Sequence, residues 1–209
     1  MNRNVRLFGR LFPSHLLITA ALSLYALILA ILFRTPDRII AFFAMLLSSL
    51  GDIILMNYRP VTDRLPVKWF TAGGVVFGVS HILYATAMAV AILRSGGTFF
   101  NAGSLAAGIL FLLLAAFYAV GTHLRDGDLK LMPLIIVYLF FICLNCSTAA
   151  AASVSLGGIR IVAAAGALLF LISDQLIFLN KLIKIRIRNS DFWIWLPYTA
   201  GQLLLLTGC

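Results

Sequence analysis

The stretch Gly166-Ala-Leu-Leu-Phe170-Leu-Ile-Ser173-Asp174 carries a carboxyl group at the end of an apolar helical run. An ionisable side chain inside a membrane-spanning helix is energetically expensive, so it is by default a candidate for function. A second acid, Asp52, has the same kind of surroundings in Ser48-Ser-Leu-Gly-Asp52. The two stretches place both acids at membrane depth and suggest that they act together.

The composition of the 209-residue chain is that of an integral membrane protein. Hydrophobic residues make up 62% of the chain and charged residues 11%, and the mean hydropathy is +1.05. A soluble domain has about 25% charged residues, so this chain lacks the side chains that cover a water-facing surface. Each crossing takes about 20 apolar residues. We therefore expect an all-α, polytopic transmembrane helical bundle that uses residues 1–209 as a single domain.

Seven apolar segments predict about seven crossings. The first follows a basic run at the N-terminus and lacks a small-residue cleavage site, so we expect a start-transfer helix that is retained. The expected segments are Leu16–Phe33, Ile39–Met56, Trp69–Leu93, Ser104–Thr122, Leu131–Val154, Gly157–Asn180 and Phe192–Thr207.

The distribution of basic residues predicts the orientation. The chain has 16 Lys and Arg against seven acidic residues, a net charge of +9. With a cytoplasmic N-terminus, twelve basic residues fall in inside segments, and only Arg34, Arg38, Arg94 and Arg160 fall outside. This bias follows the positive-inside rule. No nucleic-acid-binding motif is present, so the charge is expected to meet anionic lipid in the bilayer, with no nucleic acid partner.

The cysteines do not predict a metal site. Cys143 and Cys146 lie three residues apart on one helix face, but zinc needs two further Cys or His ligands of matching spacing. None is near them in the sequence. We expect small packing residues here, with no metal and no cofactor.

Helix geometry brings the polar residues into one half of the membrane. At about 1.5 Å of rise per residue, Asp52, Asp174 and Tyr198 each lie roughly 7–9 Å from the inner boundary. His81 lies deeper, near the midplane, and the depth of Gln202 is between that of His81 and that of the other three residues.

The helical faces agree with these depths. Tyr84 lies three residues after His81 on the polar stripe of its segment, and Ser173 lies beside Asp174. Ser48 lies one turn before Asp52, within reach of a hydrogen bond to it.

A single His, Gln or Tyr in a membrane helix is more often a packing or interhelical hydrogen-bonding residue than a catalyst. A buried aspartate is different, because hydrogen bonds between membrane helices average only about 0.6 kcal/mol and do not offset the burial of a carboxylate. Two aspartates at matched depth therefore favour a functional site.

Four motifs follow one another over most of the chain: Leu50-Gly51-Asp52, Phe77-Gly78-x-x-His81-x-x-Tyr84, Gly166-Ala167-x-x-Phe170-x-x-Ser173-Asp174 and Tyr198-x-x-x-Gln202. At these residues the sequence resembles the YhhN family of membrane proteins, whose characterised members are lysoplasmalogenases. That family is usually drawn with eight crossings. The crossing that this sequence lacks is the first, ahead of the motifs, and its loss fits a cytoplasmic N-terminus.

The resemblance implies hydrolysis of the vinyl ether bond of a lysoplasmalogen to a fatty aldehyde and glycerophosphocholine or glycerophosphoethanolamine. Proton delivery to carbon gives an oxocarbenium ion, which adds water and collapses to the aldehyde. In glycoside hydrolysis a protonated acid and a carboxylate divide such work. Two close, buried acids cannot both ionise easily, so Asp52 and Asp174 are the expected catalytic pair, with either one as the acid.

Further residues receive supporting roles under this reading. The side chains expected to position water or the glycerol hydroxyl are those of His81, Tyr84, Ser173, Tyr198 and Gln202. The basic residues expected to attract the phosphate are Lys181, Lys184 and Arg186. The expected location is a bacterial inner membrane, with the endoplasmic reticulum as the alternative, and the sequence leaves the oligomeric state open.

Three other readings remain. Intramembrane Asp and His also build proton relays, so a small proton-coupled transporter is one alternative, although the chain has no inverted repeat or Gly/Pro-broken helix pair. An intramembrane aspartyl protease also pairs two aspartates, but Ser49-Leu50-Gly51 precedes Asp52 in place of the Gly-x-Gly of that class. A non-catalytic membrane protein that keeps the motifs for packing is the third.

Overall fold

The computed structural model describes residues 3–124, 129–181, 183–185 and 187–209, with the side chains from residue 15 onward except that of Lys181. These residues form eight helices and no strand, which confirms the all-α fold. The helices are α1 (Arg3–Phe33), α2 (Pro36–Leu55), α3 (Arg59–Thr62), α4 (Trp69–Arg94), α5 (Ala102–Leu124), α6 (Met132–Leu156), α7 (Arg160–Lys181) and α8 (Ser190–Gly208).

The seven long helices correspond to the seven expected segments. Six of them, α1, α2, α4, α5, α6 and α7, are long and apolar enough to cross a membrane, so the chain is a multi-pass membrane protein. Helix α8 is not among the six, and its sequence includes the polar residues Asp191 and Gln202. Its 19 residues rise about 28 Å, close to the thickness of a bilayer core. The short α3 was not expected.

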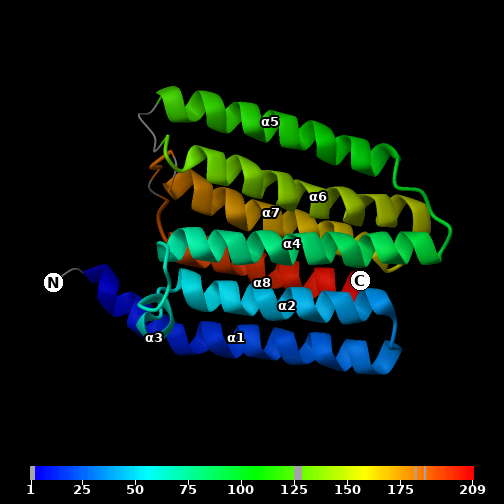
Figure 1. The fold of residues 1–209 in the computed structure, drawn as a ribbon, viewed down its shortest axis with the longest axis horizontal. Coiled ribbons are helices and arrows are strands. Elements are labelled where there is room, and N and C mark those ends of the chain that lie inside the picture. Colours follow the sequence, from blue (N-terminus) through cyan, green and yellow to red (C-terminus); the bar gives the residue numbers. More distant parts are fainter. Residues whose placement is uncertain (1–2, 125–128, 182, 186) are drawn as a thin grey trace.

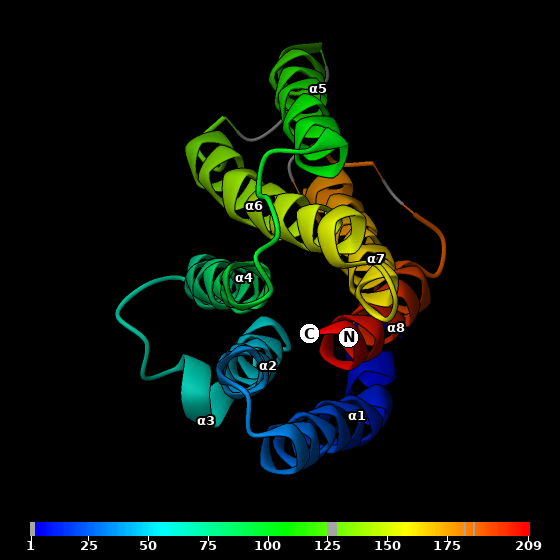
Figure 2. The same ribbon diagram turned by 90° about the vertical axis from the view of Figure 1, so that its right-hand side faces the viewer.

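The long helices alternate in direction and enclose the interior of the bundle. Seen along the bundle, α1, α2, α4, α6, α7 and α8 form a ring in which each helix packs against the next, and α5 lies outside against α6 (Figures 1 and 2). We call the end that holds the last turn of α2 and the first turn of α8 the inner end, after the predicted orientation, and the opposite end the outer end.

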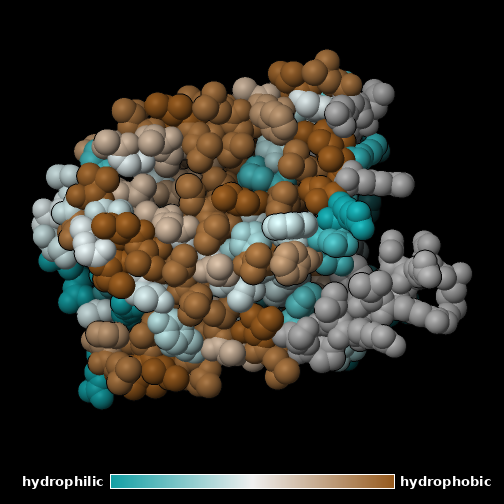
Figure 3. Space-filling view, turned by 180° about the vertical axis from the view of Figure 1, so that it is seen from behind, coloured by the Kyte–Doolittle hydropathy of each residue, from teal (hydrophilic) through white to brown (hydrophobic). Residues whose placement is uncertain are grey.

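The outward-facing side chains are mostly apolar. Figure 3 shows a hydrophobic surface over most of one face between the two ends, with hydrophilic residues gathered mainly toward the ends. On α5, Leu105, Leu112 and Leu113 are each more than 60% exposed. A continuous apolar surface of this kind marks a membrane contact, so these side chains face lipid.

Two glycines set the distance between α7 and α8. A Cβ on Gly201 would come within 2.8 Å of the backbone nitrogen of Phe170, and one on Gly166 would meet the backbone of α8. Small residues at such positions allow membrane helices to approach closely. The contact brings the polar residues of α7 and α8 into the same part of the interior.

At the outer end, Asp37 forms salt bridges with Arg94 at 3.2 Å and with Arg160 at 3.1 Å. Arg38 and Arg160 also donate hydrogen bonds to the last carbonyl groups of α8, which have no partner within the helix. Arg34 likewise donates to the carbonyl of Ile31 in the last turn of α1, so all four basic residues expected outside neutralise an acid or cap a helix end. The side of the membrane that this end faces stays a prediction.

Candidate active site

Asp52 lies in the last turn of α2 and is only 5% exposed. Its Oδ2 atom accepts a hydrogen bond from the hydroxyl of Tyr198 at 2.7 Å and another from Thr19 Oγ1 at 2.8 Å. Because Thr19 lies on α1 and Tyr198 on α8, three helices fix the orientation of this carboxyl group.

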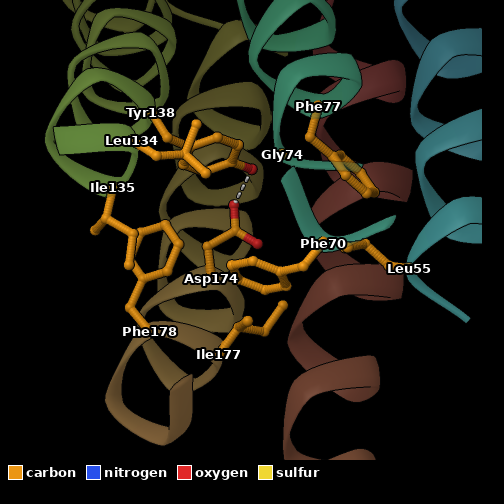
Figure 4. A pocket seen from close by; sticks show the side chains of 10 residues that line it. All are labelled: Leu55, Phe70, Gly74, Phe77, Leu134, Ile135, Tyr138, Asp174, Ile177 and Phe178. Carbon is orange, nitrogen blue, oxygen red and sulfur yellow. Dashed lines mark hydrogen bonds between the residues drawn. The ribbon is translucent and has the colours of Figure 1, made fainter. Parts of the chain in front are cut away.

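Asp174 lies on α7 and is 6% exposed. Its Oδ2 atom accepts a hydrogen bond from the hydroxyl of Tyr138 on α6 at 2.7 Å (Figure 4). The Nε2 atom of His81, on α4, lies 3.6 Å from the same carboxyl oxygen and 3.1 Å from the Tyr138 hydroxyl. A second set of three helices thus orients the second acid.

Both acids line one cavity of about 410 Å³, which we call the larger cavity. It lies between α2, α4, α7 and α8 and reaches the inner end at Met56, Asn180 and Asp191. The Oδ1 atom of neither acid accepts a hydrogen bond from a described residue, so each acid has one oxygen fixed by tyrosine and one left for a ligand or water.

A smaller cavity of about 30 Å³ adjoins Asp174 between α4, α6 and α7. Its lining is apolar except for Asp174 and the Tyr138 hydroxyl, and Figure 4 shows Asp174 between side chains of α6 and of α4. A Cβ on Gly74 would meet nothing within 4 Å, whereas one on Gly78, a turn deeper, would touch Phe141 of α6. The gap between α4 and α6 is therefore open at Gly74 and closed at Gly78.

The five residues predicted to position substrate or water divide into two groups. Ser173 and Tyr198 line the larger cavity, and Ser173 also donates a hydrogen bond to the carbonyl of Ile194 at 2.8 Å. Tyr84, Gln202 and His81 do not line it.

Those three residues support the acids or their tyrosine partners, directly or through one another, without lining the larger cavity. Tyr84 donates to Gln202 Oε1 at 2.7 Å, and Gln202 Nε2 donates to the Tyr198 hydroxyl at 3.3 Å, so both support Tyr198. His81 in turn contacts Tyr138 and Asp174.

The predicted hydrogen bond from Ser48 to Asp52 is wrong. Ser48 shares a hydrogen bond of 2.7 Å with Ser80, and Ser80 also donates to the carbonyl of Ala44 at 2.8 Å. Ser48 therefore faces α4 and helps to join α2 to α4. Thr19 of α1 takes the place expected for Ser48.

Sequence reasoning missed Thr19, Tyr138 and Asn145. Asn145 is fully buried, and its Nδ2 atom lies 3.4 Å from His81 Nδ1, while its Oδ1 atom has no hydrogen-bond partner among the described residues. Tyr138 and Asn145 are seven residues apart, which puts both on the same face of α6. A buried amide and a hydroxyl at that spacing in an apolar segment were the available signal.

The structure does not bring the basic residues after α7 into the larger cavity. Lys184 is exposed, the side chain of Lys181 is not described, and Arg186 lies outside the described residues. No lysine or arginine of the described ranges lines the cavity. The role predicted for these residues in attracting phosphate stays a prediction.

The cysteines are packing residues, as expected. Cys143 and Cys146 are buried and unpaired in α6, and Cys146 Sγ contacts the carbonyl of Ala167 on α7 at 3.4 Å. Across the described part of the chain, no three His, Cys, Asp or Glu side chains converge in a way that would hold a metal ion.

Comparison with protein families gives one match. The model of the YhhN family matches residues 12–209, a range that contains Asp52, Asp174 and every partner named above. No curated protein and no solved structure matches the chain.

Proposed function

The chain belongs to the YhhN family, and on that premise we propose that it is a membrane-embedded hydrolase that cleaves the vinyl ether bond of lysoplasmalogens. The products are a fatty aldehyde and a glycerophospho-base. The observation that carries the proposal is the pair of acids in one cavity, each fixed through Oδ2 by a tyrosine hydroxyl. This arrangement fits a reaction in which a proton donor and a carboxylate both act on one small functional group of the substrate.

The chemistry divides between the two acids. One of them, in its protonated form, delivers a proton to the β-carbon of the vinyl ether, and the double bond becomes an oxocarbenium ion. The carboxylate of the other acid stabilises this cation and removes a proton from the water that attacks it. The resulting hemiacetal breaks at the bond between the former vinyl carbon and the glycerol oxygen, and the hydroxyl proton ends on that oxygen.

The surroundings of the acids support this division. A tyrosine hydroxyl holds Oδ2 of each acid in place, and Thr19 also holds that of Asp52, so Oδ1 is the oxygen available to the substrate. Prior orientation of the reacting groups lowers the barrier, because the cost of aligning them is met in folding.

The two cavities fit the two parts of a single-chain lipid. The smaller cavity is apolar and lies in the gap between α4 and α6, so it suits the methylene groups next to the vinyl ether, and the rest of the hydrocarbon chain would pass through the gap at Gly74. The larger cavity reaches the inner end and includes polar groups, so it suits the glycerol and the headgroup. Asp174 lines both cavities, at the position where the vinyl ether would lie.

The test is to incubate the purified protein with a lysoplasmalogen and with the matching ester lysolipid, and to measure free aldehyde and free fatty acid. We expect aldehyde from the first substrate and no fatty acid from the second. Asp52→Asn and Asp174→Asn should each abolish aldehyde release while thermal unfolding stays close to that of the unchanged protein. Full activity in both variants would defeat the two-acid scheme, and proton flux in liposomes without lipid cleavage would favour the transporter.

A further inference from the structure

We propose that the inner part of the larger cavity is a binding subsite for a positively charged ammonium group, with Asp191 as its counter-ion. The inference rests on the proposed function only for the identity of the ligand, which would be the amine-bearing headgroup of a lysophospholipid.

The charge of the larger cavity is opposite to that of the chain. The protein has 16 basic and seven acidic residues, yet three of those seven acids, Asp52, Asp174 and Asp191, line this one cavity. Among the residues that the structure describes, no lysine or arginine lines it. A concave site lined by one sign of charge attracts ligands of the other sign.

Asp191 is available to a ligand. It lies in the first turn of α8, and it forms no salt bridge within the described ranges. His15 of α1 is close enough for its charge to interact with that of Asp191, and its ring stacks on Trp195 with ring centroids 3.8 Å apart. Trp69, the first residue of α4, and Trp195, one turn after Asp191 on α8, also line the cavity. An acid together with indole rings is a combination that binds alkylammonium groups.

The spacing along α8 fits the length of the lipid. Asp191, Trp195 and Tyr198 lie at positions i, i+4 and i+7 on one helical face. Asp191 therefore lies about 10 Å from Tyr198, the partner of Asp52, in the direction of the inner end. In a lysophospholipid, about ten bonds separate the vinyl ether carbon from the headgroup nitrogen, and an extended chain advances about 1.2 Å per bond. A substrate held at the catalytic acids would thus bring its ammonium group to Asp191.

A purely structural role for Asp191 is the competing explanation, since an acid in the first turn of a helix interacts favourably with the helix dipole. The two explanations differ in ligand dependence. Loss of a dipole contact would weaken the binding of every ligand alike, whereas loss of a counter-ion would weaken only that of ligands with an ammonium group.

The experiment measures binding of two non-hydrolysable single-chain ligands to the full-length protein in a non-ionic detergent. Dodecylphosphocholine carries the ammonium group, and dodecyl phosphate does not. Tryptophan fluorescence reports binding because Trp69 and Trp195 line the cavity. The titration is run at about pH 8, where a histidine with the ordinary pKa near 6.5 is neutral.

We expect the unchanged protein to bind dodecylphosphocholine more tightly than dodecyl phosphate. Asp191→Asn should weaken binding of dodecylphosphocholine about fivefold, the effect of losing one partly exposed ion pair, and should leave dodecyl phosphate binding unchanged or stronger. Asp63→Asn is the matched control, because Asp63 is an exposed acid just after α3 that does not line the cavity. It should change neither affinity.

Three results would overturn the subsite: unchanged binding in Asp191→Asn, an equal loss for both ligands, or a preference of the unchanged protein for dodecyl phosphate. Asp191→Ser repeats the test if the Asn variant unfolds at a lower temperature. Neither ligand contains a vinyl ether. A protein that binds them as expected but releases no aldehyde would therefore contradict the proposed function and leave the subsite intact.

Discussion

The hydroxyl of Tyr138 donates a hydrogen bond to Asp174 Oδ2 across 2.7 Å, which ties α6 to α7 at the acid. Tyr198 makes the same contact with Asp52 Oδ2, also at 2.7 Å. The site therefore consists of two acid–tyrosine pairs whose carboxyl groups line a common cavity. Four predictions follow from this arrangement and from the helix packing that supports it.

Removal of either tyrosine hydroxyl should lower the rate of aldehyde release. Tyr138→Phe and Tyr198→Phe each keep the ring but lose a hydrogen bond to a carboxyl group, and we expect kcat/KM to fall about tenfold or more. Tyr25→Phe is the control, because the hydroxyl of Tyr25 forms a hydrogen bond with Thr207 and Tyr25 does not line the larger cavity. Equal kinetics in all three variants would mean that the tyrosines do not orient the acids.

Asn145→Leu should lower the rate of aldehyde release without lowering the stability of the protein. Among the described residues, the buried Oδ1 atom of Asn145 has no hydrogen-bond partner, so its replacement by an apolar group of similar volume removes a desolvation cost that offsets the loss of the Nδ2 contact. The variant also loses the contact to His81, which lies against Tyr138 and Asp174. We expect a Tm close to that of the unchanged protein together with slower aldehyde release. A lower Tm with full activity would assign Asn145 to the fold alone.

Gly74→Leu should close the smaller cavity against long hydrocarbon chains. The leucine side chain would extend into the open space between α4 and α6, so we expect kcat/KM to fall about tenfold for a long-chain lysoplasmalogen and much less for a short-chain vinyl ether. Gly108→Leu on α5 is the matched control, since a Cβ there also meets nothing within 4 Å. An equal loss for long and short substrates would show that the chain does not lie in this cavity.

Gly201→Ala should destabilise the bundle by about 1–3 kcal/mol, the usual cost of overpacking. The new methyl group would press on the α7 backbone near Phe170. Alanine is otherwise the better helix former by about 1 kcal/mol, so Gly74→Ala, where the methyl group meets nothing within 4 Å, should be neutral or stabilising. Thermal unfolding in detergent compares the two. A Gly201→Ala protein as stable as Gly74→Ala would mean that α7 and α8 pack less closely than described.

The helices could be predicted from sequence because long apolar runs leave few alternatives. The expected segment Ile39–Met56, for example, is observed as the helix Pro36–Leu55. The four-residue α3 has no such run, so it was missed. Depth along each helix also follows from residue counting, and it correctly brought Tyr198 to the level of Asp52.

The partners of the acids could not be predicted in the same way. Residue counting fixes a side chain relative to its own helix but not relative to the neighbouring helix that it faces. Ser48 was therefore assigned to Asp52, although it faces Ser80 on α4. Thr19 and Tyr138 resemble ordinary residues of apolar helices, and only the packing of α1 and α6 shows that their hydroxyl groups contact the acids.

The two cavities meet at Asp174 and lead in different directions, one to the helix ends and one into the gap between α4 and α6. Cleavage at their junction would sort the products by solubility. The phosphate-bearing alcohol would leave to water, while the aldehyde would pass laterally into the bilayer. There it would be kept apart from the soluble amines with which it would otherwise condense.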